Sequence, residues 1–94
     1  MGASFFSERG LGKTAEIAFE QLVEEARFDF GHAGYTGTIA EKTEFKMIEC
    51  PKGWDPEDWI EEDEALAQVE DKWGPAGCID LGGGEWLFFG FASS

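Results

Sequence analysis

The strongest constraint on the fold is the pattern of acidic and apolar residues between Trp54 and Trp73, WDPEDWIEEDEALAQVEDKW. Asp55 stands where a helix N-cap belongs, and Pro56 occupies the first helical position. Gly74-Pro75 then supplies a stop signal. The pattern therefore predicts one amphipathic helix over 54–73 with an acidic outer face. Its predicted apolar seam comprises Trp59, Leu66, Val69 and Trp73, with Ile60 and Ala67 at the edge.

The negative charge of the chain is concentrated in the same segment. Residues 55–73 hold nine acidic residues and one basic residue, a net charge of −8 out of −13 for all 94 residues. Such acidity argues against direct binding of nucleic acid or of an anionic membrane, both of which require a basic surface. A general adaptation to high salt would spread the charge more evenly. The concentration therefore favours a specific binding surface, with a merely solvated helix face as the alternative.

The length and composition predict a single domain over 1–94. A hydrophobic content of 43%, with four Trp and nine Phe, indicates a packed core rather than disorder. The start, MGASFFSERG, has neither a basic region nor a long apolar run, so we expect no signal peptide. No apolar run approaches membrane-spanning length. Cys50 and Cys78 fit a reduced cytoplasmic protein whose thiols are small core residues, and a disulfide between them is the alternative if the fold brings them together.

The remaining segments predict an α+β fold. A short strand over 3–6 precedes a helix over 14–29, whose buried stripe is Ala15, Ala18, Phe19, Leu22 and Ala26, with Gly31 as its cap. Residues 35–39 and 45–48 favour strands, and the strands 76–81 and 85–92 form a hairpin around three glycines. The predicted order is β-α-β-(β)-α-β-β. We expect two helices packed on one face of a small, mostly antiparallel sheet.

One stretch resembles a known group of proteins. GKTAEIAFEQLVEEARFDFGHAGYTGTIAEK, together with DKWGPAGCID and WLFFGFASS, is similar to small proteins encoded by bacteriophages and related prophages. The most distinctive string is Gly34–Lys42, GYTGTIAEK, which is either a folding signature or a site. No activity is established for those proteins, so the resemblance implies no catalytic residues. It implies a phage accessory protein in the cytoplasm of a bacterial host, a setting in which inhibitors of host defence or host enzymes are common.

A second group of residues suggests a small-ligand site. Gly10-Leu11-Gly12-Lys13-Thr14 opens a helix and is similar to the end of a phosphate-binding loop, but Ser7 stands where that motif needs glycine. Nucleotide hydrolysis is therefore not expected, and simple helix initiation is the alternative. The candidate ligand-binding residues are Arg9, Lys13, His32 and Tyr35. For His32 and Tyr35 the alternative is a bracing role between helix and strand.

Signals for metal binding and catalysis are weak. His32, Cys50 and Cys78 lack the paired spacing of a zinc site, and the acidic run lacks the glycine of a calcium loop. Adjacent carboxylates on an exposed helix do not form a glycosidase pair. We therefore expect no metal or cofactor and favour a binding protein over an enzyme.

Three functional hypotheses follow. The first is an acidic nucleic-acid mimic that occupies a basic groove on a host protein. Nine carboxylates along roughly 24 Å of helix would place one charge per roughly 3 Å, against about 1.7 Å in duplex DNA. Its candidate partner-binding residues are Glu57, Asp58, Glu61, Glu62, Glu64 and Asp71. The second is a protein that sequesters a nucleotide or another small molecule. The third is a self-associating protein whose final strand, Trp86 to Phe91, lies centrally in the sheet or pairs across a homodimer.

Overall fold

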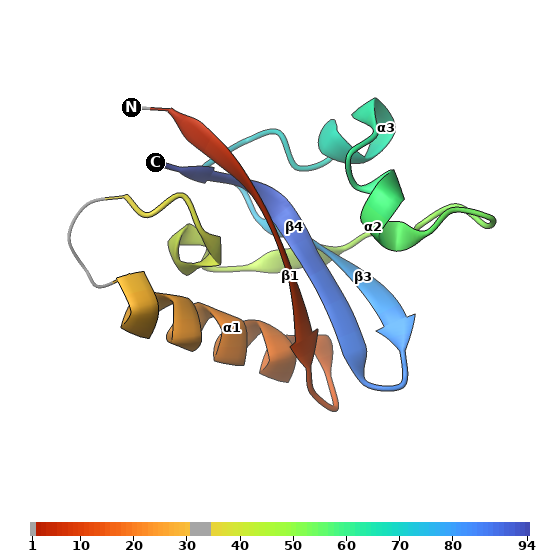
Figure 1. Ribbon diagram of the computed structural model, residues 1–94, viewed down its shortest axis with the longest axis horizontal. Helices are drawn as coiled ribbons and strands as arrows, with labels where there is room; N and C mark the ends of the chain where they lie inside the picture. Colours follow the sequence, from red (N-terminus) through yellow and green to blue (C-terminus); the bar gives the residue numbers. More distant parts are fainter. Residues whose placement is uncertain (1, 31–34) are drawn as a thin grey trace.

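A four-stranded sheet with helices on both sides forms the framework of the protein (Figure 1). The computed structural model describes residues 2–30 and 35–94. The elements are β1 (Ala3–Leu11), α1 (Ala15–Phe30), the 3₁₀ helix η1 (Ile39–Glu41), β2 (Phe45–Met47), α2 (Pro56–Trp59), α3 (Asp63–Leu66), β3 (Ala76–Gly82) and β4 (Glu85–Ser93). The predicted α+β class with a mostly antiparallel sheet is confirmed. The first strand runs five residues beyond the predicted range of 3–6.

The apolar final strand occupies the middle of the sheet. The strand order is β1-β4-β3-β2, with β4 antiparallel to both of its neighbours and β2 parallel to β3. The sequence predicts that this strand either lies in the centre of the sheet or pairs across a dimer, and the structure places it in the centre. Because β1 and β3 occupy both of its edges, β4 cannot also pair across a dimer, and that version of the self-association hypothesis is wrong.

The predicted β3–β4 hairpin is confirmed. Gly83 and Gly84 have φ values of 62° and 82°, as a two-residue turn of the type that matches strand twist requires. A register irregularity between Asp80 and Gly82 marks a bulge just before the turn. The Asp80 carboxylate accepts a hydrogen bond from the Gly82 amide at 2.8 Å and stabilises this bulge.

Helix α1 covers one face of the sheet with the predicted stripe. Thr14 caps the helix, since its hydroxyl accepts a hydrogen bond from the Ile17 amide. A Cβ added to Gly10 would lie 3.0–3.3 Å from Leu22 and Ala18, so glycine in β1 lets the helix approach closely. The core on this side comprises Phe6, Ala15, Ala18, Phe19, Leu22, Val23, Ala26, Ile39, Ala76, Cys78, Phe88 and Ala92.

The other two helices lie on the opposite face, so the prediction that both helical regions share one face is wrong (Figure 1). The physical reason lies in the strand order. The connection from β1 to β2 and the connection from β2 to β3 both join parallel strands, but they cross the sheet in opposite directions. Such connections are almost always right-handed, and two right-handed connections of opposite direction must cover opposite faces. The second core comprises Ile48, Trp59, Ile60, Ala65, Val69, Ile79, Leu87 and Phe89.

The predicted continuous helix over 54–73 is replaced by α2 and α3, each one turn long. The predicted start is right, because Asp55 accepts a hydrogen bond from the Glu57 amide and Pro56 follows. The chain then turns at residues 60–62. On a straight helix Ile60 and Ala65 would point roughly 140° apart, yet both are buried against the sheet. The turn brings both to the core and also separates carboxylates that would repel one another at helical i, i+4 spacing.

The end of the acidic segment also differs from the prediction. Trp59 and Val69 are buried as expected, but Trp73 is 65% exposed and lies outside the core. Its ring contacts Tyr35 edge-on, with 5.5 Å between the centroids. Trp73 therefore belongs to the surface, and Leu66 is half-buried, so Trp59 and Val69 are the members of the predicted seam that anchor the segment.

The predicted strand at 35–39 is a hydrogen-bonded loop that leads into η1. The amide and hydroxyl of Thr36 both donate to the Glu41 carboxylate, at 3.0 and 2.8 Å. The Thr38 hydroxyl accepts from the Ala40 amide, and Gly37 turns the chain with a φ of 69°. Threonine hydroxyls thus accept hydrogen bonds from backbone amides that would otherwise pair with a neighbouring strand. The described part of the Gly34–Lys42 string therefore has a structural role in this loop, while Gly34, His32 and the predicted cap Gly31 lie outside the described residues.

Lys42 ends this loop as a buried cation, 2% exposed. Its Nζ donates to the carbonyl oxygens of Gly74 at 2.8 Å and Lys72 at 3.2 Å, with the Asp71 carbonyl at 3.5 Å. Burial lowers the pKa of Lys42, and the nearby Asp71 carboxylate partly opposes that shift. The ammonium thereby holds the end of the acidic segment against the loop before β2.

Replacing Lys42 by Met removes the donor while keeping an unbranched side chain. We expect K42M to lower the free energy of unfolding by about 1–3 kcal/mol, because buried carbonyls lose their partner. Urea unfolding of K42M and of the exposed-lysine control K52M measures this, and K52M should stay within about 0.5 kcal/mol of the wild type. Equal stability of K42M and K52M would contradict the role assigned to Lys42.

Candidate functional site

The predicted partner-binding residues all lie on the surface of the acidic segment. Every carboxylate between Asp55 and Asp71 is exposed, and four apolar residues between them, Trp59, Ile60, Ala65 and Val69, are buried beneath. The six candidates are Glu57, Asp58, Glu61, Glu62, Glu64 and Asp71. The segment therefore forms an acidic surface held on the sheet by its own core residues.

The shape of this surface differs from the expected straight row of charges. With α2 and α3 separated by a turn, the segment that carries the carboxylates folds back on itself to one side of the sheet (Figure 1). The predicted helix length of roughly 24 Å does not apply, because no single helix axis runs through the segment. A regular, duplex-like spacing of charges is therefore absent from these residues.

Arg9 neutralises one member of the acidic surface. Its guanidinium pairs with the Glu57 carboxylate in α2, and its second nitrogen lies 3.6 Å from Glu85 in β4. The hydrogen bond and the charge of Glu57 raise the pKa of Arg9. These are the two ion pairs found among residues 2–30 and 35–94, so the other carboxylates of the surface form no ion pair there, although Asp71 lies near the buried Lys42.

Two of the four predicted small-ligand residues, Arg9 and Tyr35, lie at opposite ends of the sheet. Arg9 is held by Glu57, and Tyr35 packs on Trp73 at the other end of the sheet. Lys72, next to Trp73, donates to the Gly2 carbonyl, and Gly2 is roughly 23 Å along β1 from Arg9 at about 3.3 Å per residue. Lys13 lies in the turn before α1, and His32 lies outside the described residues.

The glycine-containing turn before α1 is also unsuited to phosphate. The Gly12 amide donates to the Gly84 carbonyl at 3.0 Å, and the Gly12 carbonyl accepts from the Trp86 indole at 3.0 Å. Gly10 is paired with Trp86 inside the sheet. The amides of Gly10 and Gly12 are therefore used by the fold, and the segment serves to start α1.

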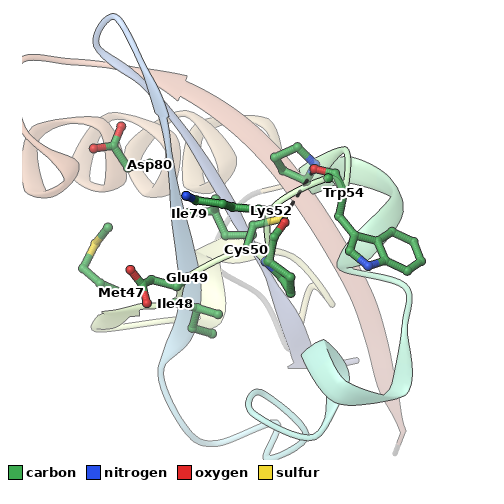
Figure 2. Close-up of a pocket in the computed structure, with 11 residues that line it drawn as sticks. Met47, Ile48, Glu49, Cys50, Lys52, Trp54, Ile79 and Asp80 are labelled. Carbon is green, nitrogen blue, oxygen red and sulfur yellow. Dashed lines mark hydrogen bonds between the residues drawn. The ribbon is translucent and has the colours of Figure 1, made fainter.

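A pocket that sequence reasoning missed lies where β2 and β3 end (Figure 2). Its volume is about 450 Å³, and Figure 2 places Trp54 at one end with Met47 and Asp80 toward the other. Ile48 and Ile79 supply apolar lining, while Glu49, Lys52 and Asp80 supply charges. The sequence signal was only a Pro51-Lys52-Gly53 turn between a strand and a capped helix, which does not reveal that β3 lies beside it.

The thiol in this pocket braces the loop. Cys50 Sγ lies 3.6 Å from the Pro51 carbonyl and 3.7 Å from the Trp54 carbonyl, both within weak hydrogen-bond range (Figure 2). Burial, followed by the charge of Asp55, raises the pKa of Cys50, so the thiol is protonated at neutral pH and is a poor nucleophile. Both cysteines are free. Among the described residues no group of three or more His, Cys, Asp or Glu side chains is placed to hold a metal ion.

Comparison of the chain with protein-family models, with curated proteins and with solved structures finds no match. Within the part of the chain that the structure describes, no helix has the length and apolarity needed to cross a membrane.

The buried thiol makes stability depend on pH. Burial raises the pKa of Cys78 from 9.0 to about 12. Below pH 9 the Cys78 thiol is protonated in both the folded and the unfolded protein, so the stabilisation from burying the neutral thiol is complete there. That stabilisation is lost as the pH rises from about 9 to about 12, because the unfolded protein ionises first.

We expect the C78A variant to lose less stability than the wild type between pH 9 and pH 12, because it has no thiol at this position. Denaturant unfolding at pH 8 and pH 10.5 measures the difference, and parallel losses would contradict the assignment.

Proposed function

We propose that the protein is a phage-type accessory protein that binds a basic groove of a bacterial host protein through its acidic surface, and inhibits that protein by occupying the groove. The observation that carries the proposal is the set of exposed carboxylates that form no ion pair among the described residues. Partner lysines or arginines would supply the missing counter-charges. Such complementarity speeds association and excludes partners that carry the same charge.

The anchoring of the acidic surface supports a binding role. Trp59 and Ile60 are 2% exposed, and Ala65 and Val69 are 0% and 3% exposed. The carboxylates are therefore carried by a backbone already fixed against the sheet, and binding need not order a flexible segment. A preorganised surface loses less conformational entropy on association.

The folded shape narrows what the surface would recognise. A straight helix would have imitated the regular phosphate spacing of a nucleic acid, whereas two short helices present a compact cluster of charge. The acidic surface would therefore imitate only a short part of a nucleic acid, and the protein would fill only part of the basic groove. Host proteins that handle nucleic acid or act in defence have grooves of this kind.

The central test neutralises the part of the surface that Arg9 does not touch. The variant E61Q/E62Q/E64Q should bind a partner captured from a bacterial lysate about tenfold more weakly, since three exposed ion pairs at roughly 0.5 kcal/mol each are lost. The control E8Q/E25Q/D29N removes the same charge from other exposed positions. Affinities measured between 50 and 300 mM salt should fall steeply for the wild type and less steeply for the triple variant. Equal affinities of the two triple variants, or binding insensitive to salt, would refute the proposal.

A further variant separates local charge from total charge. R9Q leaves Glu57 without its partner, so one more carboxylate becomes available to the host protein. R9Q should therefore bind the captured partner more tightly, whereas R27Q, an equal change of total charge on α1, should leave the affinity unchanged. If R27Q strengthens binding as much as R9Q, only the net charge matters, and the acidic surface is not the contact.

The second candidate function, sequestration of a small ligand such as a nucleotide, is favoured by the Cys50 pocket rather than by Arg9 and Lys13. Trp54 is 46% exposed for stacking, and Lys52 lines the same pocket. We expect W54A and K52A each to abolish any nucleotide-induced rise in melting temperature, whereas R9A/K13A should retain it. Scanning calorimetry with a nucleotide panel tests this candidate, and a wild type that no nucleotide stabilises would eliminate it.

A further inference from the structure

A groove runs between α1 and the outer edge of β2, on the opposite side of the sheet from the acidic surface. Two adjoining hollows of about 660 and 230 Å³ share Phe19, Glu20 and Thr43. Phe45 lines the smaller one and contacts the Phe19 ring, with 5.1 Å between the centroids. The groove is therefore bounded by a helix on one side and by an edge strand on the other.

The backbone of β2 is unpaired along this edge. Glu44 and Ile48 bond to β3, since the Glu44 carbonyl accepts from Ala76 and the Ile48 amide donates to Cys78. Because backbone groups alternate in direction along a strand, the N–H and C=O groups of Phe45 and Met47 point away from β3. None of the described residues bonds to them. An additional strand could use both residues without disturbing the sheet.

The rim of the groove is acidic. Glu16, Glu20 and Glu24 stand at i, i+4 and i+8 on α1, and all three are exposed. Glu44 lies on the strand side, and the basic residues among the described residues that line the groove are Arg27 and the buried Lys42. None of the four glutamates has an ion-pair partner within the described part of the chain. A basic occupant is therefore complementary to this rim.

We propose that the groove binds an extended, basic segment of a partner protein, which adds to the β2 edge as a fifth strand and places lysine or arginine side chains against the α1 glutamates. Backbone hydrogen bonds to Phe45 and Met47 supply sequence-independent affinity. Alternate side chains of the segment face the helix, so a basic residue at every second position matches the rim. Nucleic acid is repelled by the same glutamates, and a helical partner cannot bond to the strand edge.

The test uses two fluorescent ten-residue peptides of alternating lysine and valine, one of them N-methylated at every second residue. Both carry the same charge, but the methylated peptide cannot complete a strand ladder. The wild type should bind the unmethylated peptide about tenfold more tightly. Equal affinities would overturn the proposal, since charge alone would then account for binding.

Variants of the protein locate the contact. M47P removes an amide that β3 does not use, and it should lose about tenfold in affinity for the unmethylated peptide, with M47A as the matched control. The affinity of E16Q/E20Q/E24Q for the unmethylated peptide should also be about tenfold lower than that of the wild type. E61Q/E62Q/E64Q should bind as the wild type does, which separates this proposal from that for the acidic surface.

Amide hydrogen exchange of the wild type provides a measurement that does not depend on the folding of any variant. The amides of Phe45 and Met47 should become protected when the unmethylated peptide is added. Protection without peptide at high protein concentration, with a dimer in sedimentation, would assign the edge to a second copy of the chain and refute the proposal.

Discussion

The buried ammonium of Lys42 connects two parts of the chain that the sheet does not join directly. It donates to the Gly74 and Lys72 carbonyls across a separation of about thirty residues, and so fixes where the acidic segment returns to β3. The loop before it is closed by Thr36 and Glu41, so Lys42 reaches this position from a defined turn. Backbone carbonyls rather than a hydrogen-bonded carboxylate solvate the charge. The lowered pKa of Lys42 reflects the cost of burying it, which the hydrogen bonds offset.

Around this contact the molecule has two cores separated by one sheet. Phe88 in β4 faces α1, while Leu87 and Phe89 face α2 and α3, which explains why the strand is apolar at nearly every position. Gly77 in β3 permits this packing, since a Cβ there would lie 2.7 Å from the Phe89 ring and from Ile48. Division of 94 residues between two cores leaves α2 and α3 too short to be stable alone. They depend on burial of Trp59, Ile60 and Val69.

The two proposed binding surfaces use this arrangement in different ways. The acidic surface carries exposed charge on a fixed backbone, so it suits a basic groove in a partner. The groove beside β2 is concave and offers unpaired backbone groups, so it suits an extended basic segment. Because the sheet lies between them, both can be occupied at once. The high negative charge of the chain thus has two separate structural locations, and in both of them the complementary partner is basic.

Local physical chemistry was sufficient for the α+β class, the buried stripe of α1, the Asp55 cap and the β3–β4 hairpin, because each depends on residues only a few positions apart. Only the tertiary structure decided the rest. The break between α2 and α3 follows from the need to bury Ile60 and Ala65 against the same sheet. The pairing of Arg9 with Glu57, across 48 residues, placed a predicted ligand residue beside a predicted partner residue, and no local pattern contains that information. The helix faces, the burial of Lys42 and the pocket beside β3 depend on strand order, which short-range periodicity does not encode.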